Sequence, residues 1–225
     1  MPDDPSPAVV LLHGFAASFD RTWLDNGWVD LLHDVGREVV AIDLPGHGHA
    51  AKPHDPAAYE HLEDDVADRL PAGPLDGVGF SLGARVLLGV AAAHPDRFRR
   101  LVVAGVGANL FRSDDPEPIA RAIVDGPAES DRGGQHFAQL ARGDGNDPLA
   151  LAACLRRRSP PLGPSELGSI GCPVLVVLGD RDFAGPADPL IEALPDARLV
   201  TLRGVDHFAT PRAMGFLDAA LDFLA

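Results

Sequence analysis

The sequence has 225 residues, of which 46% are hydrophobic, and its formal net charge is −14. This length suits one domain with a sizeable core, and no apolar run is long enough to span a bilayer. The excess of negative charge argues against nucleic acid or an anionic membrane as a partner.

The N-terminus and the cysteines bear on the compartment. The first residues, Met-Pro-Asp-Asp-Pro, are acidic and lack both the basic region and the cleavage site of a secretory signal. Cys154 and Cys172 lie in unrelated contexts, which is typical of free thiols in a reducing compartment. We therefore expect a cytoplasmic protein.

Short apolar runs alternate with helix-like segments along most of the chain. The first run is continuously apolar, as expected of a parallel strand that is buried on both faces. The predicted strands are Ala8–Leu12, Arg37–Ile42 (also expected to be buried), Leu75–Phe80, Leu101–Ala104, Val174–Leu178 and Leu199–Leu202. The predicted helices beside them are Trp23–Val35, His61–Leu70, Ala84–Ala93, Pro189–Leu194 and Pro211–Leu224. This order predicts an α/β fold with a mostly parallel sheet and helices on both faces.

The interval from about Gly107 to Gly168 breaks the alternation, because it contains no strand-like run. Three helical pieces are instead separated by joints rich in Gly, Pro and Asp: Pro118–Val124, Gln135–Ala141 and Leu149–Arg158. Long insertions at the carboxyl ends of strands are usually functional lids. We expect a core of residues 1–106 and 169–225 with a helical cap at 107–168; surface elaboration without substrate contact is the alternative.

The motif Gly79-Phe80-Ser81-Leu82-Gly83 stands between a predicted strand and a predicted helix. In such a strand–turn–helix the serine lies at the apex, and the two glycines keep neighbouring backbone from colliding. The helix directs its free N–H groups and the positive end of its dipole toward whatever binds at the serine. Ser81 is therefore the predicted nucleophile.

A histidine must accept the proton of this serine, because a hydroxyl alone is a weak nucleophile. His207 follows the last predicted strand and is the predicted base. His13 and His47 lie in glycine-containing loops and are expected to shape the backbone. The other histidines are expected at the surface: His33, His49, His54, His61, His94 and His136.

An acid must then orient the histidine. The segment Gly179-Asp180-Arg181-Asp182 follows the fifth strand and offers two carboxylates. Asp182 is the predicted acid, because the turn must run two or three residues past the strand to reach the next loop. Asp180 is expected to pair with Arg181 or to cap the turn. Asp206 adjoins His207, and adjacent side chains generally diverge.

Taken together, these motifs resemble those of capped, lipase- or esterase-like α/β-hydrolases over nearly the whole chain. The resemblance rests on the order Ser81, Asp182, His207 and on these stretches: His13-Gly14-Phe15, Asp43-Leu44-Pro45-Gly46-His47-Gly48, the serine motif, Gly179–Asp182 and Asp206-His207-Phe208. It implies an oxyanion hole made by the backbone N–H groups of Phe15 and Leu82. The antiparallel strands that usually precede the first parallel strand are missing, so we expect a sheet of about six strands.

The resemblance implies hydrolysis of a carboxylic ester, thioester or lactone of a small molecule through an acyl-enzyme. No metal cluster, dinucleotide fingerprint or phosphate loop is visible in the sequence, so no cofactor is expected. A monomer or homodimer is expected. The candidate substrate-binding residues are His13, Gly14, Arg85, Phe111 and Phe137, with Phe19 as a further pocket residue.

Two alternatives remain open from the sequence, the first being a lyase, or a carbon–carbon hydrolase, that uses the same Ser81, His207 and Asp182 as a base. The stretch Ser81-Leu82-Gly83-Ala84-Arg85 is similar to that of menaquinone-pathway lyases of the same fold, where the activated serine acts as a base. Arg85 would then bind a substrate carboxylate through two parallel hydrogen bonds. The other alternative is a hydrolase fold that serves as a receptor or scaffold without catalysis.

Overall fold

The computed structural model describes residues 7–143 and 145–225. Its centre is a six-stranded sheet in the order β2-β1-β3-β4-β5-β6, in which every neighbouring pair is parallel. The strands are β1 (Val9–Leu12), β2 (Val39–Ile42), β3 (Leu75–Phe80), β4 (Phe98–Ala104), β5 (Val174–Gly179) and β6 (Ala197–Leu202). The predicted α/β fold and the predicted number of strands are confirmed.

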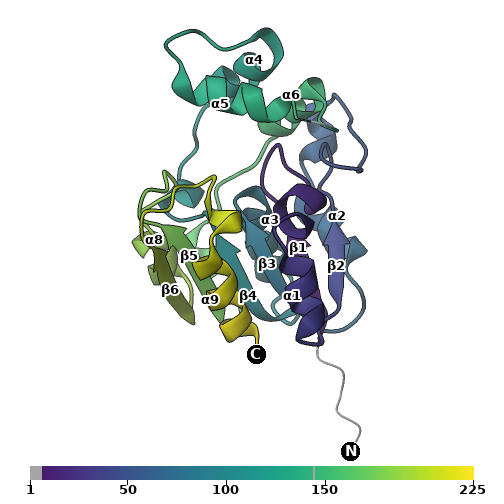
Figure 1. Ribbon diagram of the computed structural model, residues 1–225, viewed down its shortest axis with the longest axis vertical. Helices are drawn as coiled ribbons and strands as arrows, with labels where there is room; N and C mark the ends of the chain where they lie inside the picture. The colour runs from purple at the N-terminus through teal and green to yellow at the C-terminus, as the bar shows by residue number, and fades with distance from the viewer. Residues whose placement is uncertain (1–6, 144) are drawn as a thin grey trace, which may run out of the picture.

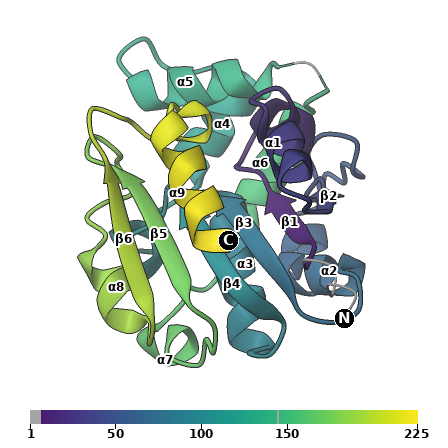
Figure 2. The same ribbon diagram turned by 60° about the horizontal axis from the view of Figure 1, so that its bottom comes forward.

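Helices cover both faces of the sheet (Figures 1 and 2). On one face lie α1 (Trp28–Asp34) and α9 (Met214–Leu224). The other face is covered by α2 (Leu62–Arg69), α3 (Leu82–Ala93) and α8 (Asp188–Ala193). This arrangement explains why the inner strands are continuously apolar, since neither of their faces meets water.

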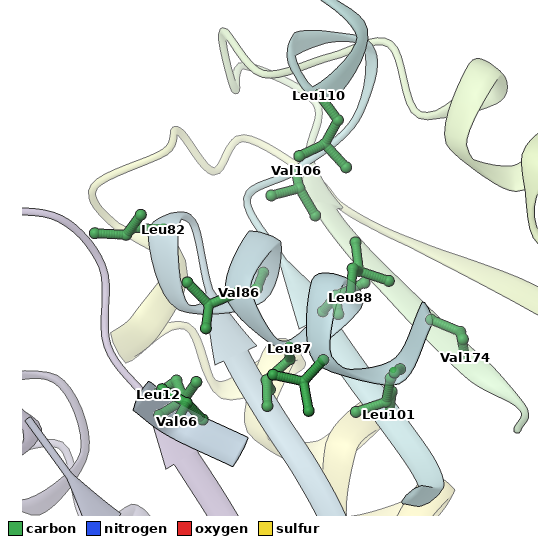
Figure 3. Close-up of a cluster of buried hydrophobic side chains, with 14 of the residues drawn as sticks. Leu12, Val66, Leu82, Val86, Leu87, Leu88, Leu101, Val106, Leu110 and Val174 are labelled. Carbon is green, nitrogen blue, oxygen red and sulfur yellow. The ribbon is translucent and has the colours of Figure 1, made fainter. Parts of the chain in front are cut away.

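The core has one apolar layer on each side of the sheet. Figure 3 shows the layer under α3, where Val86, Leu87 and Leu88 lie against the strands and Leu101 of β4. The opposite layer contains a cluster of large rings: Trp28 lies 5.0 Å from Trp23 and 4.6 Å from Phe216 between ring centroids. All three of these rings are buried, so this cluster anchors the elements that carry them.

Three sequence-based expectations about this core need correction. The strand near Ile42 is not buried throughout, because β2 is an edge strand with one neighbour and only Ile42 in it is fully buried. The helix expected at Trp23–Val35 is two elements, a π-helical turn η1 (Asp20–Leu24) and α1, separated by Gly27 with φ +77°. The last predicted helix is likewise divided into a 3₁₀ turn and α9.

The remaining helical elements complete the chain. The 3₁₀ turns are η2 (Pro56–Tyr59), η3 (Ala108–Phe111) and η4 (Thr210–Arg212). The segment between β4 and β5 holds α4 (Glu117–Asp125), α5 (Arg132–Ala141), α6 (Pro148–Arg156) and α7 (Pro164–Leu167). The three helices predicted in this segment are thus confirmed, each with its bounds shifted by a few residues.

The inserted segment, residues 107–168, is not uniform. Helices α4, α5 and α6 stand together over one end of the sheet (Figure 1) and share a small core of Ala16, Ile123, Ala141 and Leu151. The two ends of the segment pack into the main core through Leu110 and Leu167, and α6 also contacts that core through Ala153 and Cys154. The raised part is therefore shorter than the interval that lacks strands.

Gly83 marks the closest approach of α3 to β1. A Cβ atom on Gly83 would lie 2.2 Å from the backbone oxygen of Leu12. Backbone cannot move aside as a flexible side chain can, so we expect Gly83→Ala to lower the free energy of unfolding by about 3 kcal/mol. Urea denaturation measures this loss.

Gly89, in the same helix, provides the matched control. The three atoms nearest to a Cβ atom there would all belong to the side chain of Glu63, with its Cγ at 2.6 Å. That side chain can rotate, and alanine gains up to about 1 kcal/mol of helix propensity, so Gly89→Ala should change stability by no more than about 1 kcal/mol. Equal losses in the two variants would contradict the packing argument.

Candidate active site

Ser81 occupies a strained turn between β3 and α3. Its φ and ψ are 52° and −109°, a conformation that costs free energy for a residue other than glycine. The Ser81 N–H donates to the carbonyl of Ala104 at 2.8 Å. A Cβ atom on Gly79 would lie 2.7 Å from the backbone of Ala84, so only glycine fits there. The turn holds the Ser81 hydroxyl at one end of the sheet.

The structure brings His207 and Asp182 to this hydroxyl. His207 Nε2 lies 3.0 Å from Ser81 Oγ, and His207 Nδ1 lies 2.9 and 3.0 Å from the two carboxylate oxygens of Asp182. A carboxylate only accepts hydrogen bonds, so Nδ1 carries the proton and Nε2 is free to accept from the serine. The Asp182 side chain is fully buried, and its Oδ1 also accepts from the Ala184 N–H at 2.8 Å. This geometry suits proton transfer from Ser81 to His207.

Three aromatic rings surround the imidazole of His207. The ring centroids of Phe183, Phe80 and Phe208 lie 4.3, 4.9 and 5.4 Å from that of His207. On another side, a Cβ atom on Gly105 would approach His207 Cε1 to 3.1 Å. The side chain of His207 is therefore only 6% exposed and is fixed by packing as well as by hydrogen bonds.

The other two acids near this site accept hydrogen bonds from backbone N–H groups of nearby turns. Asp180 Oδ1 accepts from the Gly204 N–H at 2.7 Å, and Asp206 Oδ1 accepts from the Ala209 N–H at 2.9 Å. Neither carboxylate is bonded to His207. These contacts agree with the expectation that Asp180 caps a turn and that Asp206 diverges from its neighbour.

The backbone N–H groups of Phe15 and Leu82 are the predicted oxyanion hole; Leu82 follows Ser81 directly, and Phe15 lines the same cavity as Ser81. Within residues 7–143 and 145–225, neither amide donates a hydrogen bond to another group of the protein. Leu82 is the first residue of α3, where N–H groups have no partner inside the helix. Two free N–H groups beside a nucleophile are what an oxyanion requires.

Buried histidines support the loop that carries Phe15. His13 Nδ1 donates to the carbonyl of Gly14 at 2.8 Å, and His13 Nε2 accepts from the Leu44 N–H at 3.1 Å. Burial lowers the pKa of His13 and lowers the pKa of His47 to about 3, so both rings are uncharged at neutral pH. They shape the loop, as the sequence analysis expected.

An asparagine of the inserted segment also holds this loop. Asn146 Nδ2 donates to the carbonyls of Ala16 and Leu140, each at 3.0 Å. Ala16 follows Phe15 and has a positive φ of 56°. Asn146 thus ties the end of α5 to the loop that carries Phe15.

A cavity of about 410 Å³ opens beside Ser81 and His207. Its lining is mostly apolar and comes from both the core and the inserted segment: Phe15, Ala16, Ala17, Phe80, Ile119, Phe137, Leu140, Leu155, Phe183, Phe208 and Pro211, with the polar residues Arg21, Thr22, Asn26, Ser81, His207 and Arg212. An apolar cavity with a few polar groups is typical of a small-molecule site.

Of the predicted substrate-binding residues, Phe137 lines this cavity and four do not. His13 is fully buried, and Gly14 packs against the Phe80 ring, 2.8 Å from where a Cβ atom on Gly14 would lie. Phe111 packs against the core layer under α3. Phe19, expected in the pocket, packs on the opposite layer. Ring positions in the inserted segment depend on how its helices fold back, which periodicity along the chain does not reveal.

Arg85 also lies outside the cavity. Its Nη2 donates to Ser159 Oγ at 3.0 Å and to the carbonyl of Pro160. One turn beyond Ser81, the side chain points toward the end of the inserted segment, where these two groups hold its guanidinium. The lyase alternative needed this arginine beside the serine, so the structure removes its main support.

Several residues at this site were not predicted from the sequence. Phe183 and Phe208 adjoin Asp182 and His207 in sequence, and that adjacency was the available signal. His136 was expected at the surface, but its ring is half-buried and lies 3.8 Å from that of Phe208. No sequence pattern links α5 to the loop after β6, so this contact appears only in three dimensions.

The described residues contain neither a membrane-spanning helix nor a cluster of metal ligands. No helix there is both long and apolar enough to cross a membrane. No group of three or more His, Cys, Asp or Glu side chains in that part of the chain is placed to hold a metal ion.

Comparison with known proteins decides the family. Residues 9–220 match the Alpha/beta hydrolase family. The chain belongs to this family. The hydrolase is 32% identical to a pimeloyl-[acyl-carrier protein] methyl ester esterase of Neisseria meningitidis, over 91% of this chain and 87% of that protein. It is 30% identical to the esterase of the same name from Nitrosomonas europaea, over 89% and 88% of the two chains.

Solved structures agree with this assignment. The enol-lactonase from Burkholderia xenovorans LB400 superposes with a TM-score of 0.77 at 25% identity, covering 100% of this chain and 93% of that one. A bromoperoxidase from Bacillus anthracis gives a TM-score of 0.77 at 23% identity, over 97% and 92% of the two chains, and shows the shared fold. With its family and its esterase relatives, the protein is a hydrolase.

Proposed function

We propose that this hydrolase cleaves a carboxylic ester of a small molecule through an acyl-enzyme formed on Ser81. The observation that carries the proposal is the unbroken chain of contacts from Ser81 Oγ to His207 Nε2 and from His207 Nδ1 to Asp182. Such a chain makes an alcohol nucleophilic at neutral pH. The esterase relatives support the same chemistry.

The first half of the reaction acylates the serine. Ser81 Oγ attacks the ester carbonyl carbon while His207 Nε2 takes the hydroxyl proton, and Asp182 stabilises the imidazolium. The N–H groups of Phe15 and Leu82 donate to the resulting oxyanion; one such donor contributes roughly 2.7–4 kcal/mol to lowering the barrier. The intermediate then collapses, and the alkoxide leaves as the alcohol with the proton from His207.

The second half of the reaction releases the acid. A water molecule gives its proton to His207 Nε2 and attacks the acyl carbon, which forms a second oxyanion at the same two amides. Collapse breaks the bond to Ser81 Oγ, and the proton on His207 returns to the serine. Overall, one ester and one water molecule are consumed, and one acid and one alcohol are formed.

In this proposal the inserted segment acts as a cap over a core of residues 1–106 and 169–225. Ile119, Phe137, Leu140 and Leu155 come from that segment and line the cavity above Ser81. Their apolar side chains favour an aliphatic acyl group. Helices α4 to α6 form this cap, because they carry all four of these cavity-lining side chains.

The test measures the shared acyl-enzyme. p-Nitrophenyl octanoate and phenyl octanoate are hydrolysed in the presence of methanol, which competes with water. One acyl-enzyme must give the same ratio of methyl ester to acid from both substrates, because the leaving group has already departed. No turnover of either ester, or a ratio that depends on the leaving group, would overturn the proposal.

A further inference from the structure

The cavity beside Ser81 has a positively charged rim. Arg21 and Arg212 line it, and both residues are exposed. Among the residues that the structure describes, no Asp or Glu lines this cavity, although the chain has 33 acidic residues against 19 Lys and Arg. The ester chemistry proposed above uses neither arginine. A positive rim on a strongly acidic protein would concentrate anions at this opening.

Arg21 projects from an unusual and well-anchored element. It belongs to the π-helical turn η1, a rare conformation that is frequent at functional sites. The turn rests on the fully buried ring of Trp23. Asn26 Nδ2 donates to the carbonyls of Arg21 and Thr22 at 3.1 and 3.0 Å, which closes the turn. The backbone of Arg21 is thereby fixed.

Arg212 projects from a second turn on the same aromatic cluster. It ends η4, and the carbonyl of the preceding Pro211 accepts a hydrogen bond from Trp28 Nε1 at 2.9 Å. The ring of Trp28 lies against both Trp23 and Phe216. One rigid cluster therefore positions the backbones of both arginines, so little order is lost when a ligand binds between them.

Within the described part of the chain, neither guanidinium group forms an ion pair with a carboxylate. Arg21 lies directly against the inserted segment, since a Cβ atom on Gly143 would fall 2.3 Å from its Nη1. The positive rim thus spans the junction between core and inserted segment, on the path into the cavity.

We propose that Arg21 and Arg212 bind an anionic group of the substrate, a carboxylate or a phosphate. This inference rests on the proposed function and names its substrate class: an ester whose carbonyl meets Ser81 and whose acyl chain ends in an anion. The apolar side chains of Phe137, Leu140 and Leu155 contact the stretch between these ends. A guanidinium matches either anion through two parallel N–H···O bonds.

The experiment compares three methyl esters of equal chain length. Methyl octanoate is neutral, monomethyl suberate ends in a carboxylate, and methyl 8-(phosphonooxy)octanoate ends in a phosphate. In the wild type, kcat/KM for at least one anionic ester is expected to exceed that for the neutral ester by about tenfold. The preferred anion identifies which of the two groups the rim recognises.

Variants then assign this preference to the two arginines. The ratio of kcat/KM for the anionic over the neutral ester should fall about tenfold in Arg21→Gln/Arg212→Gln. Arg203→Gln removes an exposed arginine outside the cavity lining and should leave the ratio unchanged. In the wild type, the ratio should also decline between about 20 mM and about 500 mM NaCl, because salt screens exposed charges.

The possible outcomes distinguish a failure of this inference from a failure of the proposed function on which it rests. Hydrolysis of methyl octanoate without preference for either anionic ester would overturn the inference and leave the ester assignment standing. An equal loss for all three esters in the double variant, with an unchanged ratio, would do the same. Failure of the wild type to cleave any of the three, together with failure of the aryl esters, would remove the proposed function itself.

Discussion

Ser81→Ala is expected to lower kcat for p-nitrophenyl octanoate by a factor of about 10⁴ to 10⁶, because no acyl-enzyme can form without the hydroxyl. The residual rate would come from the two free amides and from binding. The substitution removes one oxygen and its 3.0 Å contact with His207. Steady-state kinetics at saturating substrate measure the loss.

Stability provides the control for this variant. Ser81 is partly exposed and makes no side-chain cap at the start of α3, so the unfolding midpoint in urea should stay close to that of the wild type. A folded Ser81→Ala protein that retains more than about 1% of wild-type kcat would contradict the assigned nucleophile, since removing a triad member costs far more.

Asp182→Asn is expected to lower kcat by about 10⁴, although the shape of the side chain is unchanged. An amide in place of the carboxylate can present an N–H to His207 Nδ1, which then accepts and leaves the proton on Nε2. That tautomer cannot take the proton of Ser81. The full burial of the Asp182 carboxylate leaves no water to replace it.

Two neighbouring acids give matched controls for this prediction. Asp180→Asn and Asp206→Asn make the same chemical change at carboxylates that accept from the N–H groups of Gly204 and Ala209. An asparagine oxygen can accept these bonds as well, so kcat should stay within about threefold of the wild type. A loss at Asp180 as large as that at Asp182 would show that the wrong acid has been assigned.

Local patterns predicted much of this molecule. The turn at Ser81 could be predicted because its causes lie within a few residues: a buried strand, two glycines that meet backbone, and a helix start. Asp182 and His207 could be placed because parallel strands put their carboxyl ends on one edge of the sheet. No pattern had to bridge distant parts of the chain for these assignments.

Features that depend on neighbours in space were predicted less well. The strand that ends at Ile42 looks like the inner strands in composition, yet it is partly exposed because it lies at the edge of the sheet. The order of strands in the sheet is set by the whole fold, so the sequence of one apolar run does not reveal whether that strand is central or at the edge. The break between η1 and α1 depends on three-dimensional packing: residues five apart do not share one face of a continuous α-helix, and the turn at Gly27 lets both Trp23 and Trp28 enter the core.

The cavity was the hardest part to predict. Phe111 and Phe137 both lie in the inserted segment, but Phe111 packs into the core and Phe137 faces the cavity. Arg85 lies close to Ser81 in sequence but bonds to Ser159 and Pro160 instead. In each case the position of the side chain depends on where the inserted segment returns to the core.

Covalent labelling with a fluorophosphonate tests the central claim most directly, because the reagent reacts with an activated serine rather than with an ordinary hydroxyl. We expect one equivalent of label, mapped by peptide mass spectrometry to Ser81, with much slower labelling in Asp182→Asn and none in Ser81→Ala. Labelling at another residue, or equal rates in the wild type and Asp182→Asn, would contradict the claim that His207 and Asp182 activate Ser81.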